Sequence, residues 1–299
     1  MDKKDRVLAL ALLLIAVLPI LLLAHKGYRY QAVDYDRWPV PEISNHPDRT
    51  GIPGLREVSF QSDGLKVAGW YAPGSNRAAV VLLHGTQADR SSLLDEARLL
   101  TEGGFAILAI DFPGQGASQG RTQWGEQEQH AAAAAVAWLA SRSDVDADRI
   151  GALGMSLGGY ILLQLAAHDT RIRAVALVST PADLDEETRY TCSRYGLLTA
   201  WPALLTLHHL RRPGPEVPAQ QAIAGIAPRG VLLASGARDP WLIPGTTQAL
   251  FGAARDPRQM WIAPEAGHAD LGRMVPKPYG NLLRKFFADK LDARSVAAG

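Results

Sequence analysis

The 299-residue sequence has only one cysteine, Cys192, and almost no excess of charge of either sign. A single cysteine excludes an intramolecular disulfide and any zinc site built from several thiolates, and it does not fix the compartment. Lysine and arginine number 31 against 30 aspartate and glutamate, so the formal net charge is +1. With no basic surplus, we expect no nucleic-acid partner.

Signatures of nucleotide and metal binding are also missing. The sequence has no Gly-x-x-x-x-Gly-Lys-Ser/Thr run for phosphates. Its glycine-rich stretch 114–120 has the spacing Gly-x-Gly-x-x-x-Gly, which differs from the dinucleotide fingerprint. Neighbouring histidines His208 and His209 would point about 100° apart on a helix, so we interpret them as a solvated edge. We therefore expect neither a cofactor nor a metal.

One long hydrophobic run stands at the N-terminus. Residues 7–24 contain no charged or hydrogen-bonding side chain, and as a helix they would span about 27 Å, close to a bilayer core. We expect residues 1–24 to form a single-pass membrane anchor. A cleaved signal peptide is the alternative, although Leu22 is a poor residue three positions before a cut after Ala24. Both interpretations predict a membrane location with the body outside the cytoplasm.

The remainder divides into a linker and one domain. Residues 25–54 are rich in proline and glycine and have no sustained hydrophobic period, which predicts a linker. Residues 55–299 then carry an α/β pattern. It opens with two strand-like runs around Ser62, Asp63 and Gly64, a sequence typical of a hairpin.

Apolar strands alternate with helices over the rest of this domain. The expected strands are 78–84, 105–112, 149–155, 173–179, 230–236 and 258–264, and the expected helices are 91–101, 125–141, 157–167, 246–254 and 279–291. Strands that are apolar on both faces predict a mostly parallel sheet with helices on both faces, and thus an α/β fold.

A long insertion breaks this alternation at about residues 181–228. Connections of this length are usually caps over a site or mobile excursions, and we expect a small cap. Its apolar middle, residues 195–207, is too short to span a bilayer. Three interpretations stay open for this segment: it lines an acyl pocket, touches the bilayer, or packs on the body. We interpret Cys192 as an ordinary thiol of the cap.

A nucleophile motif lies between one of the strands and the next helix. Residues 154–158 read Gly-x-Ser-x-Gly, which in this context predicts a nucleophile elbow with Ser156 at its tip. The serine needs a tight, strained turn that exposes its hydroxyl, and Gly154 and Gly158 leave room for that turn. The helix that begins at Leu157 would point its positive end at a developing anion.

A base and an acid follow in the expected order. A serine hydroxyl needs a base to take its proton, and His268 lies on a loop after the last strand. The imidazole needs an acid to hold its tautomer, and Asp239 lies just beyond strand 230–236. The order Ser156, Asp239, His268 is that of α/β-hydrolases. All three would lie at the carboxyl ends of strands, where open parallel sheets place their sites.

The predicted oxyanion hole uses two backbone N–H groups. Leu157 would supply one of them, and the loop after strand 78–84 the other, with Thr86 preferred and Gln87 possible. We interpret the nearby His84 as a structural residue that shapes this loop.

These pieces together resemble the α/β-hydrolase superfamily of serine hydrolases. The resemblance rests on the segments "LLHG", "DFPGQGASQG", "GMSLGG", "SGARDPW" and "PEAGH", and it covers residues 55–291. Within the superfamily, the chain is most similar to membrane-associated serine-aminopeptidase-like and monoacylglycerol-lipase-like proteins. The resemblance implies an α/β-hydrolase fold and makes the glycine-rich stretch a structural loop with Asp111 at its base.

We therefore expect a serine hydrolase that cleaves ester or thioester acyl bonds, as a lipase or esterase does. Its partner would be a small acyl substrate such as a lipid. Alternatives remain open: an aminopeptidase-like serine peptidase, an acyltransferase, or a non-catalytic binding protein of the same fold.

Overall fold

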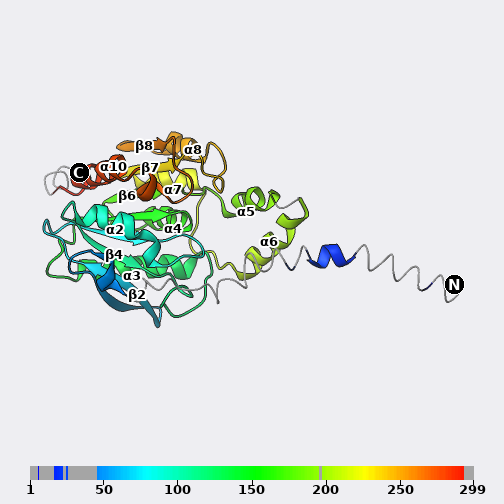
Figure 1. The fold of residues 1–299 in the computed structure, drawn as a ribbon, viewed down its shortest axis with the longest axis horizontal. Helices are drawn as coiled ribbons and strands as arrows, with labels where there is room; N and C mark the ends of the chain where they lie inside the picture. Colours follow the sequence, from blue (N-terminus) through cyan, green and yellow to red (C-terminus); the bar gives the residue numbers. More distant parts are fainter. Residues whose placement is uncertain (1–5, 7–16, 23–24, 26–45, 195–196, 293–299) are drawn as a thin grey trace.

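A sheet runs through the centre of the body (Figure 1). It has eight strands in the order β1-β2-β4-β3-β5-β6-β7-β8. This computed structural model describes residues 6, 17–22, 25, 46–194 and 197–292. The strands are β1 Arg56–Ser62, β2 Leu65–Ala72, β3 Ala79–Leu83, β4 Ala106–Ile110, β5 Ile150–Met155, β6 Ala174–Val178, β7 Gly230–Gly236 and β8 Arg258–Ala263.

The predicted hairpin joins β1 and β2. Ser62 pairs with Leu65 across a two-residue loop, and the strands are antiparallel. The loop residues Asp63 and Gly64 have φ values of 49° and 78°, as the type I′ turn of a tight hairpin requires. Strand β2 is also antiparallel to β4, whereas β4, β3, β5, β6, β7 and β8 run parallel. The prediction of a mostly parallel sheet is confirmed.

Helices cover both faces of the sheet, as predicted. The helices of the body are α2 Leu94–Thr101, α3 Glu126–Ala140, α4 Leu157–Ala166, α7 Ala219–Ile226, α8 Thr246–Ala253, α9 Leu271–Met274 and α10 Pro276–Lys290, with short 3₁₀ helices η3 Pro47–Thr50 and η4 Arg90–Leu93. In β3, Val81 packs into the apolar core that α3, α4, α7 and α8 share, while Val80 packs toward α2 and α10. Strands buried on both faces explain the uninterrupted apolar runs in the sequence.

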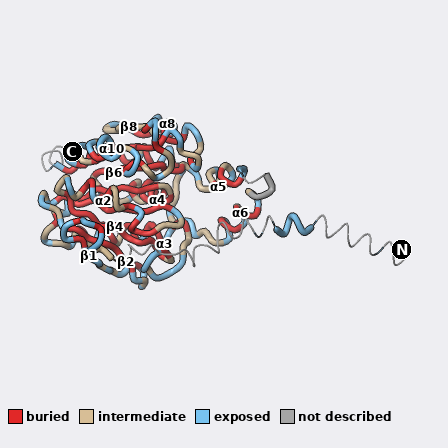
Figure 2. Tube along the Cα trace, in the orientation of Figure 1, coloured by how far each residue is buried: buried red, intermediate tan, exposed pale blue. Residues whose placement is uncertain are grey.

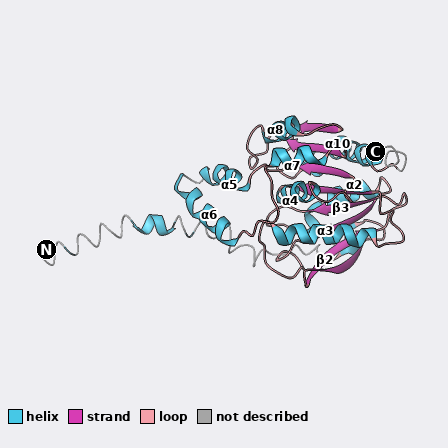
Figure 3. Cartoon of the chain, turned by 180° about the vertical axis from the view of Figure 1, so that it is seen from behind, coloured by secondary structure: helices cyan, strands magenta, loops and turns pink. Residues whose placement is uncertain are grey.

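Two helices of the predicted cap stand away from the sheet (Figures 1 and 3). They are α5, Leu184–Ser193, and α6, Leu197–Leu210. The third helix of the insertion, α7, returns to the body and buries Ala222, Ile223 and Ile226. Figure 2 shows the contrast between the buried central strands and the more exposed α5 and α6. Among the described residues of the insertion, α5 and α6 therefore form the part that projects from the body, and we refer to them as the cap.

Most of the predicted membrane segment 1–24 and of the linker 25–54 lies outside the described residues. Within the part of the chain that the structure covers, no helix is both long enough and apolar enough to cross a membrane.

Candidate active site

Ser156 occupies the turn between β5 and α4. Its backbone has φ 53° and ψ −119°, in the left-handed half of the map that residues other than glycine rarely adopt. Its N–H donates to the carbonyl of Val178 at 2.9 Å, which ties the turn to the end of β6. Helix α4 begins at the next residue, Leu157, so the positive end of the helix lies beside the serine.

Close packing of backbone on backbone explains the glycines around Ser156. A Cβ on Gly154 would lie 2.3 Å from the carbonyl oxygen of Gly158, and a Cβ on Gly158 would lie 2.2 Å from that of Leu83. Gly159 meets a similar restriction that sequence reasoning did not identify, because a Cβ there would lie 2.0 Å from Oγ1 of Thr180. No side chain fits at Gly154 or Gly158 without a backbone shift, and one at Gly159 would displace the side chain of Thr180.

Asp239 and His268 meet at the carboxyl ends of β7 and β8. Nδ1 of His268 lies 2.8 Å from Oδ2 of Asp239. The other carboxylate oxygen accepts the backbone N–H groups of Trp241 at 2.9 Å and Leu242 at 3.1 Å. Burial of Asp239 favours its neutral form, but these hydrogen bonds outweigh burial and hold the pKa of Asp239 below its usual value. The ionised acid can therefore orient the imidazole.

His84 is a structural residue of the neighbouring loop, as predicted. It is fully buried, its Nδ1 lies 2.7 Å from the carbonyl oxygen of Gly85, and its Nε2 accepts the N–H of Phe112 at 3.0 Å. This pattern fits a neutral ring with its proton on Nδ1. Burial also lowers the pKa of His84, which keeps the ring uncharged. His84 thereby connects the loop after β3 to the end of β4.

The predicted oxyanion loop lies directly against the nucleophile position. A Cβ on Gly85 would lie 3.1 Å from Cβ of Ser156. Gln87 has φ 54°, so the loop turns sharply two residues further on. Thr86 and Leu157, the two predicted donors, line the same pocket as Ser156.

Asp111 anchors the glycine-rich loop after β4. It is fully buried and accepts the backbone N–H groups of Arg90 and Ala117, each at 2.8 Å. The guanidinium of Arg90 forms an ion pair with the same carboxylate. Gly116 packs on this carboxylate so closely that its Cβ would lie 2.1 Å from an oxygen. The loop has the structural role that the resemblance implies.

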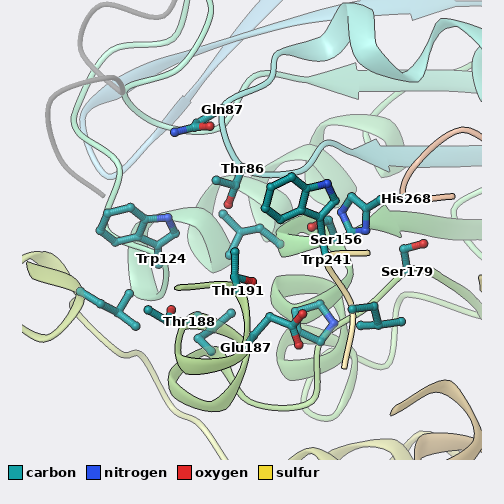
Figure 4. Close-up of a pocket in the computed structure, with 15 residues that line it drawn as sticks. Thr86, Gln87, Trp124, Ser156, Ser179, Glu187, Thr188, Thr191, Trp241 and His268 are labelled. Carbon is teal, nitrogen blue, oxygen red and sulfur yellow. The ribbon is translucent and has the colours of Figure 1, made fainter. Parts of the chain in front are cut away.

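A pocket of about 310 Å³ lies between the body and the cap (Figure 4). Ser156 and His268 both line it. The body contributes Thr86, Gln87, Trp124, Leu157, Ser179, Pro181, Trp241 and Leu242 as well, and the cap contributes Leu184, Glu187, Thr188, Thr191 and Leu207. The apolar cap segment thus supplies one pocket-lining residue, Leu207, and also presents Trp201 to solvent with 66% of its surface exposed.

Glu187 is a pocket residue that sequence reasoning missed. Burial, with a smaller contribution from the nearby carboxylate of Asp239, raises the pKa of Glu187 to about 8, although the N–H of Ile243 opposes the shift. Ser179, which is fully buried at the end of β6 with φ 46°, was also not identified.

The side chains described by the structure form no cluster of three or more histidine, cysteine or acidic groups placed to hold a metal ion. In the cap, His208 pairs instead with Asp185 at 2.6 Å and is 54% exposed. This agrees with its interpretation as a solvated edge. Cys192 is buried, and burial raises the pKa of its thiol to about 11.

Sheet order, covering helices and the turn at Ser156 together define the α/β-hydrolase superfamily of serine hydrolases. The family model of the X-Pro dipeptidyl-peptidases (S15 family) matches residues 65–249, and the chain belongs to this family. The protein is therefore a hydrolase of the α/β-hydrolase type.

Relatives in other organisms extend over most of the chain. Uncharacterized protein Rv2307c of Mycobacterium tuberculosis is 29% identical over 263 residues, which cover 84% of each chain. Uncharacterized protein YfhR of Escherichia coli K12 is 26% identical over 220 residues, 70% of this chain and 71% of YfhR.

Solved structures show the same fold at lower identity. The Pyrococcus furiosus esterase Pf2001 superposes with a TM-score of 0.70 at 20% identity, covering 82% of this chain and 94% of the esterase. A bacterial membrane phospholipase A superposes with a TM-score of 0.60 at 21% identity, covering 97% of this chain and 100% of that chain.

Proposed function

We propose that this protein is a membrane-anchored serine esterase that cleaves ester or thioester bonds to aliphatic acyl groups. Ser156 is the nucleophile, His268 the base and Asp239 the acid that orients it. The observation that carries the proposal is the 2.8 Å contact between His268 and Asp239 at a pocket that Ser156 also lines. Neither an exposed loop histidine nor a helix-capping serine requires that arrangement.

The reaction proceeds in two stages. Nε2 of His268 takes the proton of the Ser156 hydroxyl as its oxygen attacks the acyl carbonyl carbon. The resulting tetrahedral intermediate collapses, the bond to the leaving oxygen or sulfur breaks, and the imidazolium returns its proton to the leaving group. A water molecule then attacks the acyl-enzyme with the same base, which releases the acid and restores the serine.

Backbone N–H groups of Leu157 and Thr86 stabilise the oxyanion in this mechanism. Support comes from the start of α4 at Leu157, where the first N–H groups of a helix have no carbonyl partner within it. Each such donor typically contributes about 10²–10³ in rate.

The lining of the pocket favours an acyl chain over a charged substrate. Leucines and tryptophans from both the body and the cap surround the space next to Ser156, namely Leu184, Leu207, Leu242, Trp124 and Trp241. Burial of alkyl groups against such walls stabilises binding by about 25 cal/mol per Å². The apolar run at residues 7–24, long enough for a bilayer core, would hold the domain where acyl lipids are found.

A serine peptidase is the second candidate. The match to the X-Pro dipeptidyl-peptidase family favours it, since that family is named for amide cleavage. The same acyl-enzyme chemistry would apply, with an amine as the leaving group.

Labelling with a fluorophosphonate tests the assignment of the nucleophile. The wild type and Ser141→Ala, an exposed serine at the end of α3, should be labelled equally. Ser156→Ala should not be labelled. Equal labelling of Ser156→Ala would mean that another residue reacts with the probe and would remove the proposed mechanism, whereas an unlabelled wild type would favour the non-catalytic binding protein.

Turnover separates the two substrate classes. We expect the full-length protein in detergent to hydrolyse p-nitrophenyl esters, with kcat/KM rising with acyl length up to the capacity of the pocket. Cleavage of X-Pro p-nitroanilides without ester hydrolysis would favour the peptidase.

Removal of residues 1–24 should move the protein from the membrane fraction to the supernatant, and an unchanged distribution would argue against the anchor.

A further inference from the structure

Three of the four residues on the pocket-facing side of α5 are polar. Leu184, Glu187, Thr188 and Thr191 follow the spacing i, i+3, i+4 and i+7, which places them on one face of the helix, and all four line the pocket. Figure 4 shows Glu187, Thr188 and Thr191 in the pocket that Ser156 and His268 also line. Glu186 lies outside this face and is exposed. A wall that served only alkyl chains would have apolar residues at these positions.

The carboxyl of Glu187 has a free hydrogen-bonding position in this wall. One oxygen, Oε2, is shielded from solvent and has no hydrogen-bond partner among the residues that the structure describes. The N–H of Ile243 hydrogen-bonds to the same carboxyl group. A buried carboxyl oxygen that lacks a partner is costly, and a bound ligand that supplies one recovers that cost.

Charge identifies which kind of partner suits this group. Burial and the carboxylate of Asp239 raise the pKa of Glu187 to about 8, so at neutral pH the group carries its proton. The other titratable side chain lining the pocket is His268, already paired with Asp239. A neutral carboxylic acid donates a hydrogen bond, and so do the hydroxyls of Thr188 and Thr191. Three donors along one wall fit an acceptor oxygen better than an ammonium group.

We propose that Glu187, Thr188 and Thr191 form a recognition strip for an uncharged oxygen within the acyl chain, so that the preferred substrates are esters of oxygenated rather than plain alkyl acids. The oxygen would be an ether, keto or hydroxyl oxygen that accepts a hydrogen bond from the strip. This inference rests on the proposed esterase function and specifies its substrate class. A plain alkyl chain would leave Oε2 of Glu187 without a partner, and a substrate that cannot satisfy a buried polar group is rejected more strongly than one that only lacks an apolar contact.

Matched substrates test the strip. p-Nitrophenyl heptanoate is compared with its 4-oxa, 5-oxa and 6-oxa analogues, in which an ether oxygen replaces one CH₂ group and the chain length is kept. The readout is the ratio of kcat/KM for the best oxa analogue to kcat/KM for heptanoate. A general loss of structure would lower both values and leave this ratio unchanged. We expect a wild-type ratio of about 10 or more.

Matched variants locate the effect on Glu187. Glu187→Leu should lower the ratio about 10- to 100-fold, whereas Glu187→Gln, which keeps a neutral donor, should retain most of it. Thr188→Val removes a hydroxyl at nearly constant volume and should lower the ratio by a smaller factor. The control Glu186→Leu makes the same change at the adjacent exposed position of α5 and should match the wild type.

Three results would overturn the strip. The first is a wild-type ratio of 1 or less, and the second is a ratio that Glu187→Leu leaves unchanged. The third is a preference for p-nitrophenyl 6-aminohexanoate that Glu187→Gln abolishes, which would make the strip a cation site. In each case hydrolysis of heptanoate by the wild type would leave the proposed esterase function standing. If no ester is hydrolysed, both proposals fail.

Discussion

Nδ1 of His268 lies 2.8 Å from Oδ2 of Asp239, although 29 residues separate them in the sequence. Two backbone N–H groups hold the other oxygen of Asp239, so the carboxylate has a fixed orientation before any substrate arrives. A fixed acid leaves the imidazole with one favoured tautomer, whose free Nε2 is available to a hydroxyl.

Replacement of this acid gives the first prediction. Asp239→Asn keeps the volume of the side chain, but its amide no longer favours the Nδ1–H tautomer, and kcat should fall about 10⁴-fold. Rates with a soluble p-nitrophenyl ester provide the measurement. Asp270→Asn is the control. Asp270 lies in the same loop as His268, but its carboxylate accepts a hydrogen bond from the N–H of Gly267, so kcat should fall far less. Equal losses in the two variants would indicate a loop defect instead of a catalytic role.

The glycine beyond the nucleophile supports a prediction about stability. Gly158→Ala should lower the free energy of unfolding by about 3 kcal/mol or more, because its Cβ would lie 2.2 Å from the carbonyl oxygen of Leu83. Gly252→Ala in α8 is the matched control, since no atom lies within 4 Å of its Cβ. That variant should be up to about 1 kcal/mol more stable, because alanine is the better helix former. Urea unfolding of both variants distinguishes the two cases, and similar free energies would contradict the packing argument.

The elements that could be predicted are those with a strong local pattern. The strand at β7 was predicted with its observed bounds, because a continuous apolar run between turns has few alternatives. Helix α10 begins at Pro276, three residues before the predicted start at 279. Proline discourages a helix prediction, yet its fixed φ suits the first turn of a helix, where its missing N–H costs nothing.

The residues of the candidate site could likewise be predicted only where a local sequence pattern marks them. Ser156, Asp239 and His268 follow strands, so the topology of a parallel sheet predicts that they meet. Glu187 could not be found in this way, because α5 carries polar residues on several faces and no local pattern marks the face that the pocket covers. The position of the cap depends on tertiary packing, so only the structure shows that Glu187 faces the pocket.

The ion pair below the glycine-rich loop yields a third prediction. Arg90 is 3% exposed and Asp111 is fully buried, so Asp111→Asn would remove the buried one of the two carboxylates that pair with this guanidinium, and its pair with the more exposed Glu57 would remain. Loss of one partner of such a pair typically costs about 3–5 kcal/mol in the free energy of unfolding. Asp148→Asn is the control, because its pair with Arg173 is 70% exposed on the aspartate side and should change stability by less than about 1 kcal/mol. A small effect at both sites would mean that the loop does not depend on the buried pair.

Glu96 makes stability depend on pH. It lies on α2 with 2% exposure, and burial raises its pKa to about 7, against a usual value of 4.5. Because the folded state holds the proton more tightly than the unfolded state, this group destabilises the fold progressively as pH rises from 4.5 through 7. The full difference is about 3 kcal/mol above pH 7 and vanishes below pH 4.5.

Glu96→Gln should remove this dependence. Its free energy of unfolding minus that of the wild type should increase by about 3 kcal/mol between pH 4.5 and pH 8, whatever constant offset the amide introduces. Glu102→Gln is the control, since Glu102 is 56% exposed and pairs with Arg284, and its offset should vary by less than about 1 kcal/mol over the same range. Urea unfolding at several pH values gives these offsets. Parallel pH profiles for the wild type and Glu96→Gln would show that burial does not raise the pKa of Glu96.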